Sequence, residues 1–222
     1  MAHLNRPAMF TDTSSSVKPD YATGWEAAPG SQVSFTVADG WTSGRIWGRR
    51  DCVFNSTSSG ATSCSTGGCN GGLECDTSSG TGVPPASLAE WTLNGGGLDW
   101  YDVSLVDGYN IPMKITNNVG CDESDCSTDL GPDCPDALKH GNNGCLSACA
   151  ADLDGNPQDS ANCCSGSHNT AETCPSSGVQ YYSYFKEGCK NSYVYAYDES
   201  SGTALRNCSS SLNADYTLTF CP

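Results

Sequence analysis

The chain has 222 residues, and its 25 acidic against 10 basic side chains give a formal net charge of −15. Such a surface repels nucleic acids and anionic membranes but not neutral polymers such as polysaccharides. Fifteen cysteines favour a secreted, disulfide-linked scaffold over a zinc protein, because no CxxC pair repeats at finger-like spacing and the histidines are scattered. No segment is apolar enough to span a membrane, and the N-terminus lacks the apolar core of a signal peptide, so we expect a mature form or an incomplete N-terminus.

Residues 1–30 are polar and rich in turns. Alternation of apolar and polar residues over 31–38 and 44–50 predicts two strands. A loop-rich module follows, with Cys52, Cys64, Cys69 and Cys75. Within it, Asn55 begins an N-glycosylation sequon, which fits an exposed loop.

Residues 88–113 read as three short antiparallel strands separated by turns. A glycine-rich turn at 94–97 would place Glu90 opposite Asp102 on the open face of the sheet, with Asp107 at its edge. Like charges so close raise the pKa of one carboxyl group, and a general acid needs a raised pKa.

Residues 121–189 change in character, with nine cysteines and few apolar runs. We expect a separate disulfide-linked lobe there, with short helices at 136–139 and 143–151. Alternation returns at 193–197 and at 215–220, which predicts that the terminal segments rejoin the sheet domain.

Other kinds of site are less favoured. The aspartate-rich segments 122–125 and 152–159 suggest calcium loops, but 152–159 lacks the terminal glutamate and regular ligand spacing, so solvated acidic loops are favoured. The sequence lacks the G-x-S-x-G motif that would indicate a serine hydrolase. We therefore expect neither a metal nor a cofactor.

Several motifs follow one another along nearly the whole chain: IWGRRDC, GATSCSTGGCNGGLEC, PPASLAEWTLN, DWYDVSLVDGYNIPM, the adjacent Cys163 and Cys164, and the terminal TFCP. In this order they resemble the motifs of the thaumatin-like proteins, with Gly68 in place of the usual Asp. The length of the chain and the lengths of its turns are most similar to those of fungal members of the family. The resemblance implies a mainly β fold, a sandwich of about ten strands formed by 1–52, 76–120 and 190–222. A small disulfide loop module (53–75) and a disulfide-rich lobe (121–189) interrupt it.

The resemblance also implies a disulfide pairing. The pairs would be Cys52–Cys64, Cys69–Cys75, Cys121–Cys208, Cys126–Cys189, Cys134–Cys145, Cys149–Cys163 and Cys164–Cys174. Cys221 has no counterpart in this pairing. In the family its partner is a cysteine of the first strand, and this chain has MAHLNR, without a cysteine, at that position. We expect a sheet edge that lacks a strand. We also expect a monomer in which Cys221 carries a thiol, or else a dimer of two copies linked through Cys221.

Finally, the family resemblance implies a cleft between sheet and lobe, lined by Arg49, Glu90, Asp102, Asp107 and Asp198. Glu90 would be the general acid of glycoside hydrolysis, with Asp107 or else Asp102 as its partner carboxylate. Arg49 would anchor a carboxylate and Asp198 would bind sugar hydroxyls. Aromatic residues would stack on sugar rings, the candidates being Trp100, Tyr101, Tyr109, Tyr184 and Phe185. The implied function is secreted, weak endo-β-1,3-glucan hydrolysis. The alternatives are a non-catalytic glucan or cell-wall binder with a defence role, or a purely structural salt-bridge network.

Overall fold

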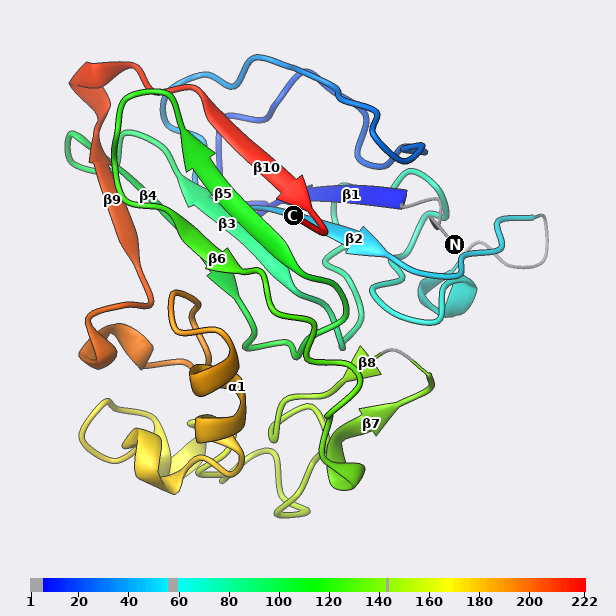
Figure 1. Ribbon diagram of the computed structural model, residues 1–222, viewed down its shortest axis with the longest axis vertical. Helices are drawn as coiled ribbons and strands as arrows, with labels where there is room; N and C mark the ends of the chain where they lie inside the picture. The colour runs from blue at the N-terminus through cyan, green and yellow to red at the C-terminus, as the bar shows by residue number, and fades with distance from the viewer. Residues whose placement is uncertain (1–5, 56–59, 143) are drawn as a thin grey trace.

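The computed structural model describes residues 6–55, 60–142 and 144–222, which form two main antiparallel sheets above a loop-rich lobe (Figure 1). The larger sheet has the order β1 (Arg6–Thr11), β2 (Gly44–Arg49), β3 (Leu88–Thr92), β4 (Leu98–Ser104) and β9 (Arg206–Ser209). The smaller has the order β10 (Tyr216–Phe220), β5 (Met113–Asn117) and β6 (Ser124–Cys126). The lobe contains a third, two-stranded sheet of β7 (Lys139–His140) and β8 (Gly144–Cys145). The predicted mainly β fold is therefore confirmed.

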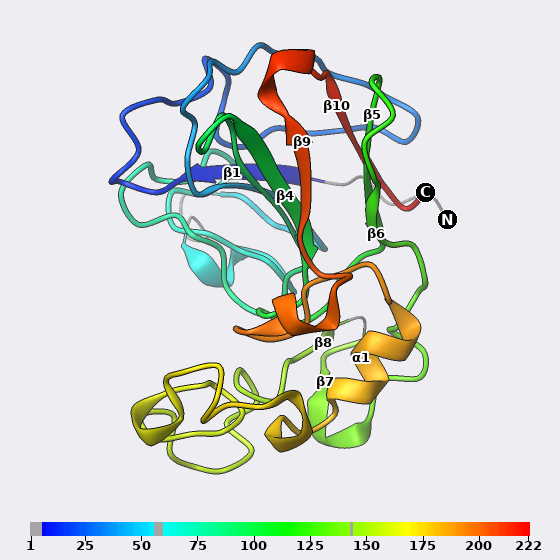
Figure 2. The same ribbon diagram turned by 90° about the vertical axis from the view of Figure 1, so that its left-hand side faces the viewer.

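The main core lies between the two large sheets, which Figure 2 shows edge-on. Trp91 of β3 and Val103 of β4 point into it and meet Met113 and Ile115 of β5, and all four are buried. Because side chains alternate along a strand, the residues between them point to the opposite, outer face of the five-stranded sheet. That outer face is the one predicted to carry the carboxylates.

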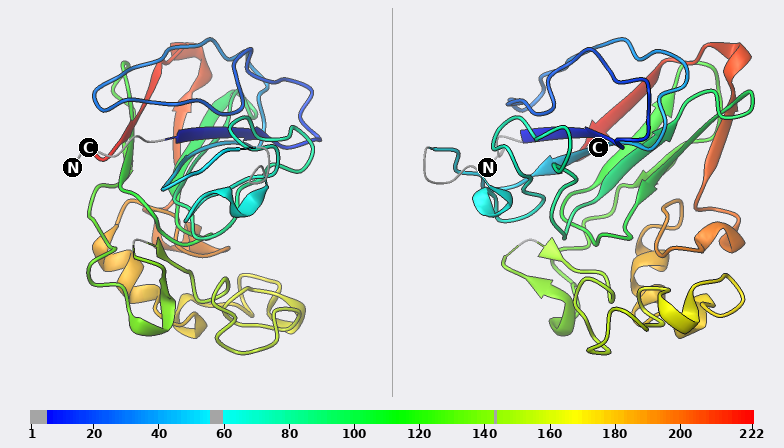
Figure 3. Two further views of the ribbon diagram at one scale, coloured as in Figure 1. Left: turned by 90° about the vertical axis from the view of Figure 1, so that its right-hand side faces the viewer. Right: turned by 180° about the vertical axis from the view of Figure 1, so that it is seen from behind.

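A second, smaller core covers one end of the outer face. Trp47 of β2 and Leu88 of β3 pack there against Cys69 and Cys75 of the small disulfide module. The module lies beside the ends of β1 and β2, where it is cyan in Figure 3.

The strands predicted in the N-terminal and central segments are only partly confirmed. Residues 44–49 form β2. The segment 88–113 supplies β3, β4 and the first residue of β5, but β5 lies in the smaller sheet rather than beside β4. The strand predicted at 31–38 is wrong. Its alternation arises because Phe35 stacks on Tyr21, with ring centroids 4.8 Å apart, while Val33 is exposed.

The lobe contains the helix α1 (Tyr182–Gly188), which the sequence did not suggest. The short 3-10 helices are η1 (Ala61–Ser63), η2 (Asp136–Leu138), η3 (Gly166–His168), η4 (Ser176–Gly178), η5 (Asp198–Ser201) and η6 (Ser210–Leu212). The turn η2 corresponds to the helix expected at 136–139. The helix expected at 143–151 is wrong, because Cys145 pairs with the backbone of Tyr109 and with β7.

The C-terminal segments also differ in part from expectation. Residues 193–197 form no strand and contribute one bridge between Tyr193 and Ser104, whereas β9 was not anticipated. The last predicted strand is present as β10. No helix within the described ranges is long and apolar enough to cross a membrane.

All seven predicted disulfides are present. They are Cys52–Cys64, Cys69–Cys75, Cys121–Cys208, Cys126–Cys189, Cys134–Cys145, Cys149–Cys163 and Cys164–Cys174. Cys221 lies outside these bridges, exposed near the C-terminus. Asn55 of the sequon is also exposed, while Ser56 and Thr57 lie outside the described residues.

Candidate functional site

A pocket of about 640 Å³ lies on the outer face of β2, β3 and β4. Its polar and charged lining residues are Ser43, Arg45, Glu90, Thr92, Asp102, Ser104, Asp107 and Glu199, and its other lining residues are Leu88, Trp91, Trp100, Val106, Tyr193 and Leu205. Four carboxyl groups and one guanidinium group therefore share one hollow in the sheet surface.

The sheet register aligns the central charged residues. Arg45 of β2 is paired with Glu90 of β3, and Glu90 is paired with Asp102 of β4. Directly opposed residues in antiparallel strands point to the same face with Cβ atoms roughly 4.5–5.5 Å apart. The predicted juxtaposition of Glu90 and Asp102 is thus present, with a cation on the other side of Glu90.

Glu90 and Asp102 differ in their access to solvent. The Glu90 side chain is 30% exposed, and its Oε1 lies 3.4 Å from the Arg45 guanidinium in an ion pair. Asp102 is only 9% exposed, and its buried Oδ1 has no hydrogen-bond partner among the described residues. Glu90 is therefore accessible to a bound ligand, whereas Asp102 is almost fully covered.

The three predicted catalytic carboxyls all have raised pKa values. Burial raises the pKa of Glu90, and the charge of Asp107 raises it further, while Arg45 and a hydrogen bond with Ser104 oppose the change. Burial raises the pKa of Asp102 well above its usual value, and the charges of Glu90 and Glu199 act in the same direction. Burial likewise raises the pKa of Asp107, against the effect of Arg45. The pocket therefore favours protonated carboxyl groups, as expected for desolvated like charges.

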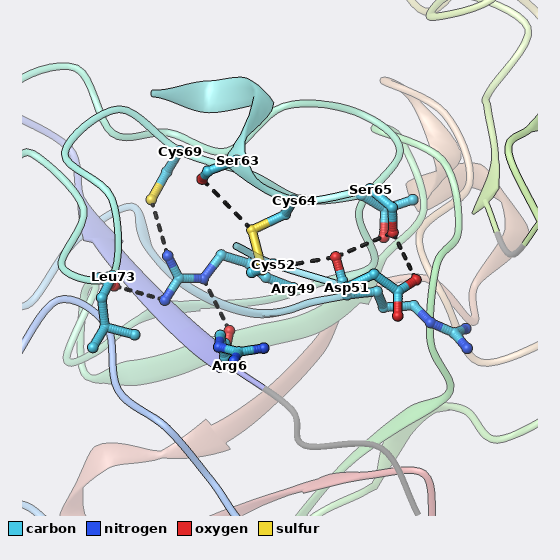
Figure 4. Close-up of a disulfide and its surroundings, with 12 residues drawn as sticks. Arg6, Arg49, Asp51, Cys52, Ser63, Cys64, Ser65, Cys69 and Leu73 are labelled. Carbon is cyan, nitrogen blue, oxygen red and sulfur yellow. Dashed lines mark hydrogen bonds between the residues drawn. A yellow bond between two sulfur atoms is a disulfide. The ribbon is translucent and has the colours of Figure 1, made fainter. Parts of the chain in front are cut away.

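The arginine of the pocket is Arg45, and the prediction that Arg49 lines it is wrong. Arg49 is fully buried beneath the small module (Figure 4). Its guanidinium donates hydrogen bonds to four backbone carbonyls, those of Arg6, Pro7, Gly72 and Leu73. Burial, together with the charge of Arg6, lowers its pKa to about 10. Arg45 and Arg49 share one face of β2, but the module covers only the end that carries Arg49.

Asp198 was predicted to contribute to the cleft, and it does not line the pocket. It is fully buried, and its carboxylate accepts hydrogen bonds from Tyr182, Lys186 and the backbone of Val194. The next residue, Glu199, lines the pocket instead. The sequence could have suggested Glu199 as well, because it is the acid directly adjacent to Asp198.

The two tyrosines predicted to bind substrate are core residues. Tyr101 and Tyr109 are at most 1% exposed, and their hydroxyls bond to the Asp122 carbonyl and the Asp129 carboxylate. Phe185 is also buried, while Tyr184 bonds to the Leu130 carbonyl and does not line the pocket. Of the aromatic candidates, Trp100 does line it, and Tyr193 is a lining residue that the sequence reasoning missed.

Two antiparallel sheets, seven disulfides and a pocket lined with carboxyls on the outer sheet face define a disulfide-rich β protein with a polar surface site. A sequence model described as the Thaumatin family matches residues 5–222, and the chain belongs to this family.

The chain is also similar to individual members of this family. It is 45% identical over 206 residues to pathogenesis-related thaumatin-like protein 3.5 of Cryptomeria japonica, covering 90% of this chain and 78% of that protein. It is 42% identical to pathogenesis-related protein 5 of Arabidopsis thaliana, with 90% and 79% covered. It is 38% identical to a glucan endo-1,3-beta-glucosidase of Prunus avium, with 92% and 82% covered.

Proposed function

We propose that this protein binds β-1,3-glucan in the pocket and slowly hydrolyses its internal bonds, as a secreted protein of defence or of cell-wall remodelling. The observation that carries the proposal is the row formed by Arg45, Glu90 and Asp102 across three strands. A relative named as a glucan endo-1,3-beta-glucosidase supports the substrate class. The disulfides fit an extracellular protein, because such bonds persist in oxidising compartments.

Hydrolysis of a glycosidic bond needs one carboxyl that protonates the leaving oxygen and a second that attacks the sugar or activates water. Glu90 suits the first role, because it is accessible in the pocket and its pKa is raised. Asp107 is our choice for the second, since Asp102 is nearly inaccessible. Arg45 takes the place that we had expected for Arg49, because it faces Glu90 and favours the ionised form of both Glu90 and Asp107.

The remaining lining residues suit a neutral sugar polymer. Trp100 supplies an aromatic ring, held by a hydrogen bond of 3.3 Å from its Nε1 to the Gly95 carbonyl. Tyr193 and Ser104 add hydroxyl groups to the lining of the pocket. Hydroxyl and carboxylate acceptors bind sugar hydroxyls, and an aromatic ring covers the apolar face of a sugar.

The alternative is that the pocket binds glucan without cleaving it. The Arg45–Glu90 ion pair favours this alternative, because it stabilises the carboxylate form of the residue that would have to donate a proton. Relatives named only as pathogenesis-related or thaumatin-like proteins are compatible with it. Both functions use the same pocket, so an assay must separate binding from cleavage.

The test compares Glu90→Gln with Glu123→Gln, a matched change at a carboxylate that pairs with Lys114 and does not line the pocket. Each protein is incubated with β-1,3-glucan, and reducing ends and retention on insoluble glucan are measured. We expect Glu90→Gln to lose nearly all release of reducing ends and Glu123→Gln to retain it. If neither wild type nor variants release reducing ends but all are retained on glucan, the protein is a binder. If wild type does neither, the proposal is wrong.

A further inference from the structure

Asp198 is a buried acid that the mechanism above does not use. Its Oδ1 accepts a hydrogen bond of 2.8 Å from the Tyr182 hydroxyl. Its Oδ2 accepts bonds of 2.8 Å from the Lys186 ammonium and 2.9 Å from the backbone N–H of Val194. Asp198 is fully buried, so these bonds replace water around its charge. We refer to Asp198, Tyr182 and Lys186 as the Asp198 cluster.

The Asp198 cluster joins the lobe to the chain segment that returns to the sheet. Tyr182 and Lys186 lie four residues apart in α1 and therefore share one face of the helix. Lys186 also donates a bond of 2.7 Å to the Ser192 carbonyl. The cluster thus holds residues 192–199, which we call the returning segment, at its start, at Val194 and near its end.

The returning segment forms one wall of the pocket. Tyr193 is attached to the end of β4, because its N–H donates to the Val103 carbonyl and its carbonyl accepts from the Leu105 N–H. Tyr193 and Glu199 both line the pocket, although Glu199 itself is exposed. Glu199 directly follows Asp198, and both belong to the turn η5 (Asp198–Ser201). This is the orange 3-10 turn beneath the sheets in Figure 2.

We infer that Asp198 is a positioning residue, which with Tyr182 and Lys186 fixes the wall that presents Tyr193 and Glu199 to the ligand. The inference rests on the proposed function for the identity of that ligand. Glu199 then acts as the fourth carboxylate of the pocket, in the place that the sequence suggested for Asp198. Its charge already reaches the centre of the pocket, because it raises the pKa of Asp102.

Burial, Glu90 and Arg45 affect the pKa of Asp102 more than Glu199 does, so the position of Glu199 is followed through the change in this pKa between variants, without an activity assay. Asp102 is faced by Arg45 from β2, Glu90 from β3, and Tyr193 and Glu199 from the returning segment. Carboxyl NMR titration of Asp102 is compared in wild type and four variants: Glu199→Gln, Asp198→Asn, Tyr182→Phe and Glu187→Gln. Glu187 is an exposed acid of the same helix, so its variant is the matched control. Tyr182→Phe removes one hydrogen bond and keeps the Lys186–Asp198 ion pair, which guards against loss of the fold in Asp198→Asn.

We expect Glu199→Gln to lower the pKa of Asp102, and Asp198→Asn and Tyr182→Phe to lower it in the same direction, while Glu187→Gln leaves it unchanged. The inference is overturned if Glu199→Gln lowers the pKa but the two cluster variants do not, or if Glu199→Gln has no effect. In parallel, Asp198→Asn should weaken binding of a soluble β-1,3-glucan by about tenfold, the effect of losing one or two hydrogen bonds to a charged group. A wild type that binds no glucan would contradict the proposed function, but the titration would still decide whether Asp198 positions Glu199.

Discussion

Glu90 of β3 lies directly opposite Asp102 of β4, so a single antiparallel pair places two carboxyl groups side by side on one sheet face. Arg45 offsets only part of this repulsion, since it forms its ion pair with Glu90 at the partly exposed side. Asp102 is buried, and its Oδ1 has no hydrogen-bond partner in the part of the chain that the structure describes. The arrangement therefore costs stability when both groups are ionised, and this cost depends on pH.

Asp102→Asn should stabilise the protein at neutral pH. The folded-state pKa of Asp102 is raised, so the folded protein binds its proton more tightly than the unfolded chain. The free energy of unfolding must then fall as the pH rises from about 4 through the folded-state pKa, by about 1.4 kcal/mol for each unit of difference. Asparagine carries no charge and can donate a hydrogen bond to Glu90, so its advantage should be present at pH 7 and vanish at about pH 3.5. Urea unfolding at the two pH values measures it, and an equal effect at both would contradict the assigned pKa shift.

Arg45→Met should change the pH dependence of the site more than its stability. Arg45 is the cation that lowers the pKa of Glu90, so its removal raises that pKa further. A general acid must be protonated, and the fall in glucan cleavage on the alkaline side should therefore move to higher pH. Because the ion pair is partly exposed, the free energy of unfolding should change by less than about 1 kcal/mol. Lys114→Met is the control, because it removes the cation of an ion pair that does not line the pocket. It should change neither the pH dependence of cleavage nor, by more than a small amount, the free energy of unfolding.

Arg49→Met should have the opposite effect, with a large loss of stability and no direct change in the pocket. The substitution leaves four buried carbonyls without the charged donor that binds them. We expect a loss of about 3 kcal/mol or more in the free energy of unfolding. Arg45→Met is the matched comparison, being the same substitution on the same face of the same strand. Similar denaturation midpoints for the two variants would refute the distinction between the two arginines.

Replacing Cys121 and Cys208 together by serine should destabilise the protein more than replacing Cys69 and Cys75. The first bridge spans 87 residues of sequence and the second only 6. On the chain-entropy model the losses are about 4.6 and about 2.2 kcal/mol. The measurement is denaturant unfolding of the two double variants. A greater loss for Cys69 and Cys75 would show that packing of their module around Arg49 outweighs loop entropy.

The central site was predictable because strand alternation fixes which residues share a face. Glu90 and Asp102 each lie one position along the strand from apolar residues, so they point to the face opposite to the apolar one. The two-residue period of a strand therefore places both carboxyl groups on the same face of the sheet. The same rule could not separate Arg45 from Arg49, since both have the parity of Trp47. Only the position of the small module, which buries Trp47 and Arg49, decides between them.

Alternation was misleading where it arose from side-chain packing without backbone pairing. At 31–38 Phe35 packs on Tyr21 and Trp25, and the backbone of these residues joins no sheet. At 193–197 the apolar residues pack on the lobe, while Tyr193 alone bridges to β4. The position of Asp198 could not be read from the sequence either, because its partners lie in α1, a helix too short to show an apolar period.

The disulfides of the lobe are nested. Cys121–Cys208 encloses Cys126–Cys189, which in turn encloses the three remaining bridges of the lobe. A protease that cuts one peptide bond between Cys126 and Cys189 therefore leaves both fragments covalently joined and still attached to the sheets. Damage to an exposed loop of the lobe need not release the segment that carries Tyr193 and Glu199. The pocket would therefore stay assembled after such a cut, and the two fragments would separate only on a reducing gel.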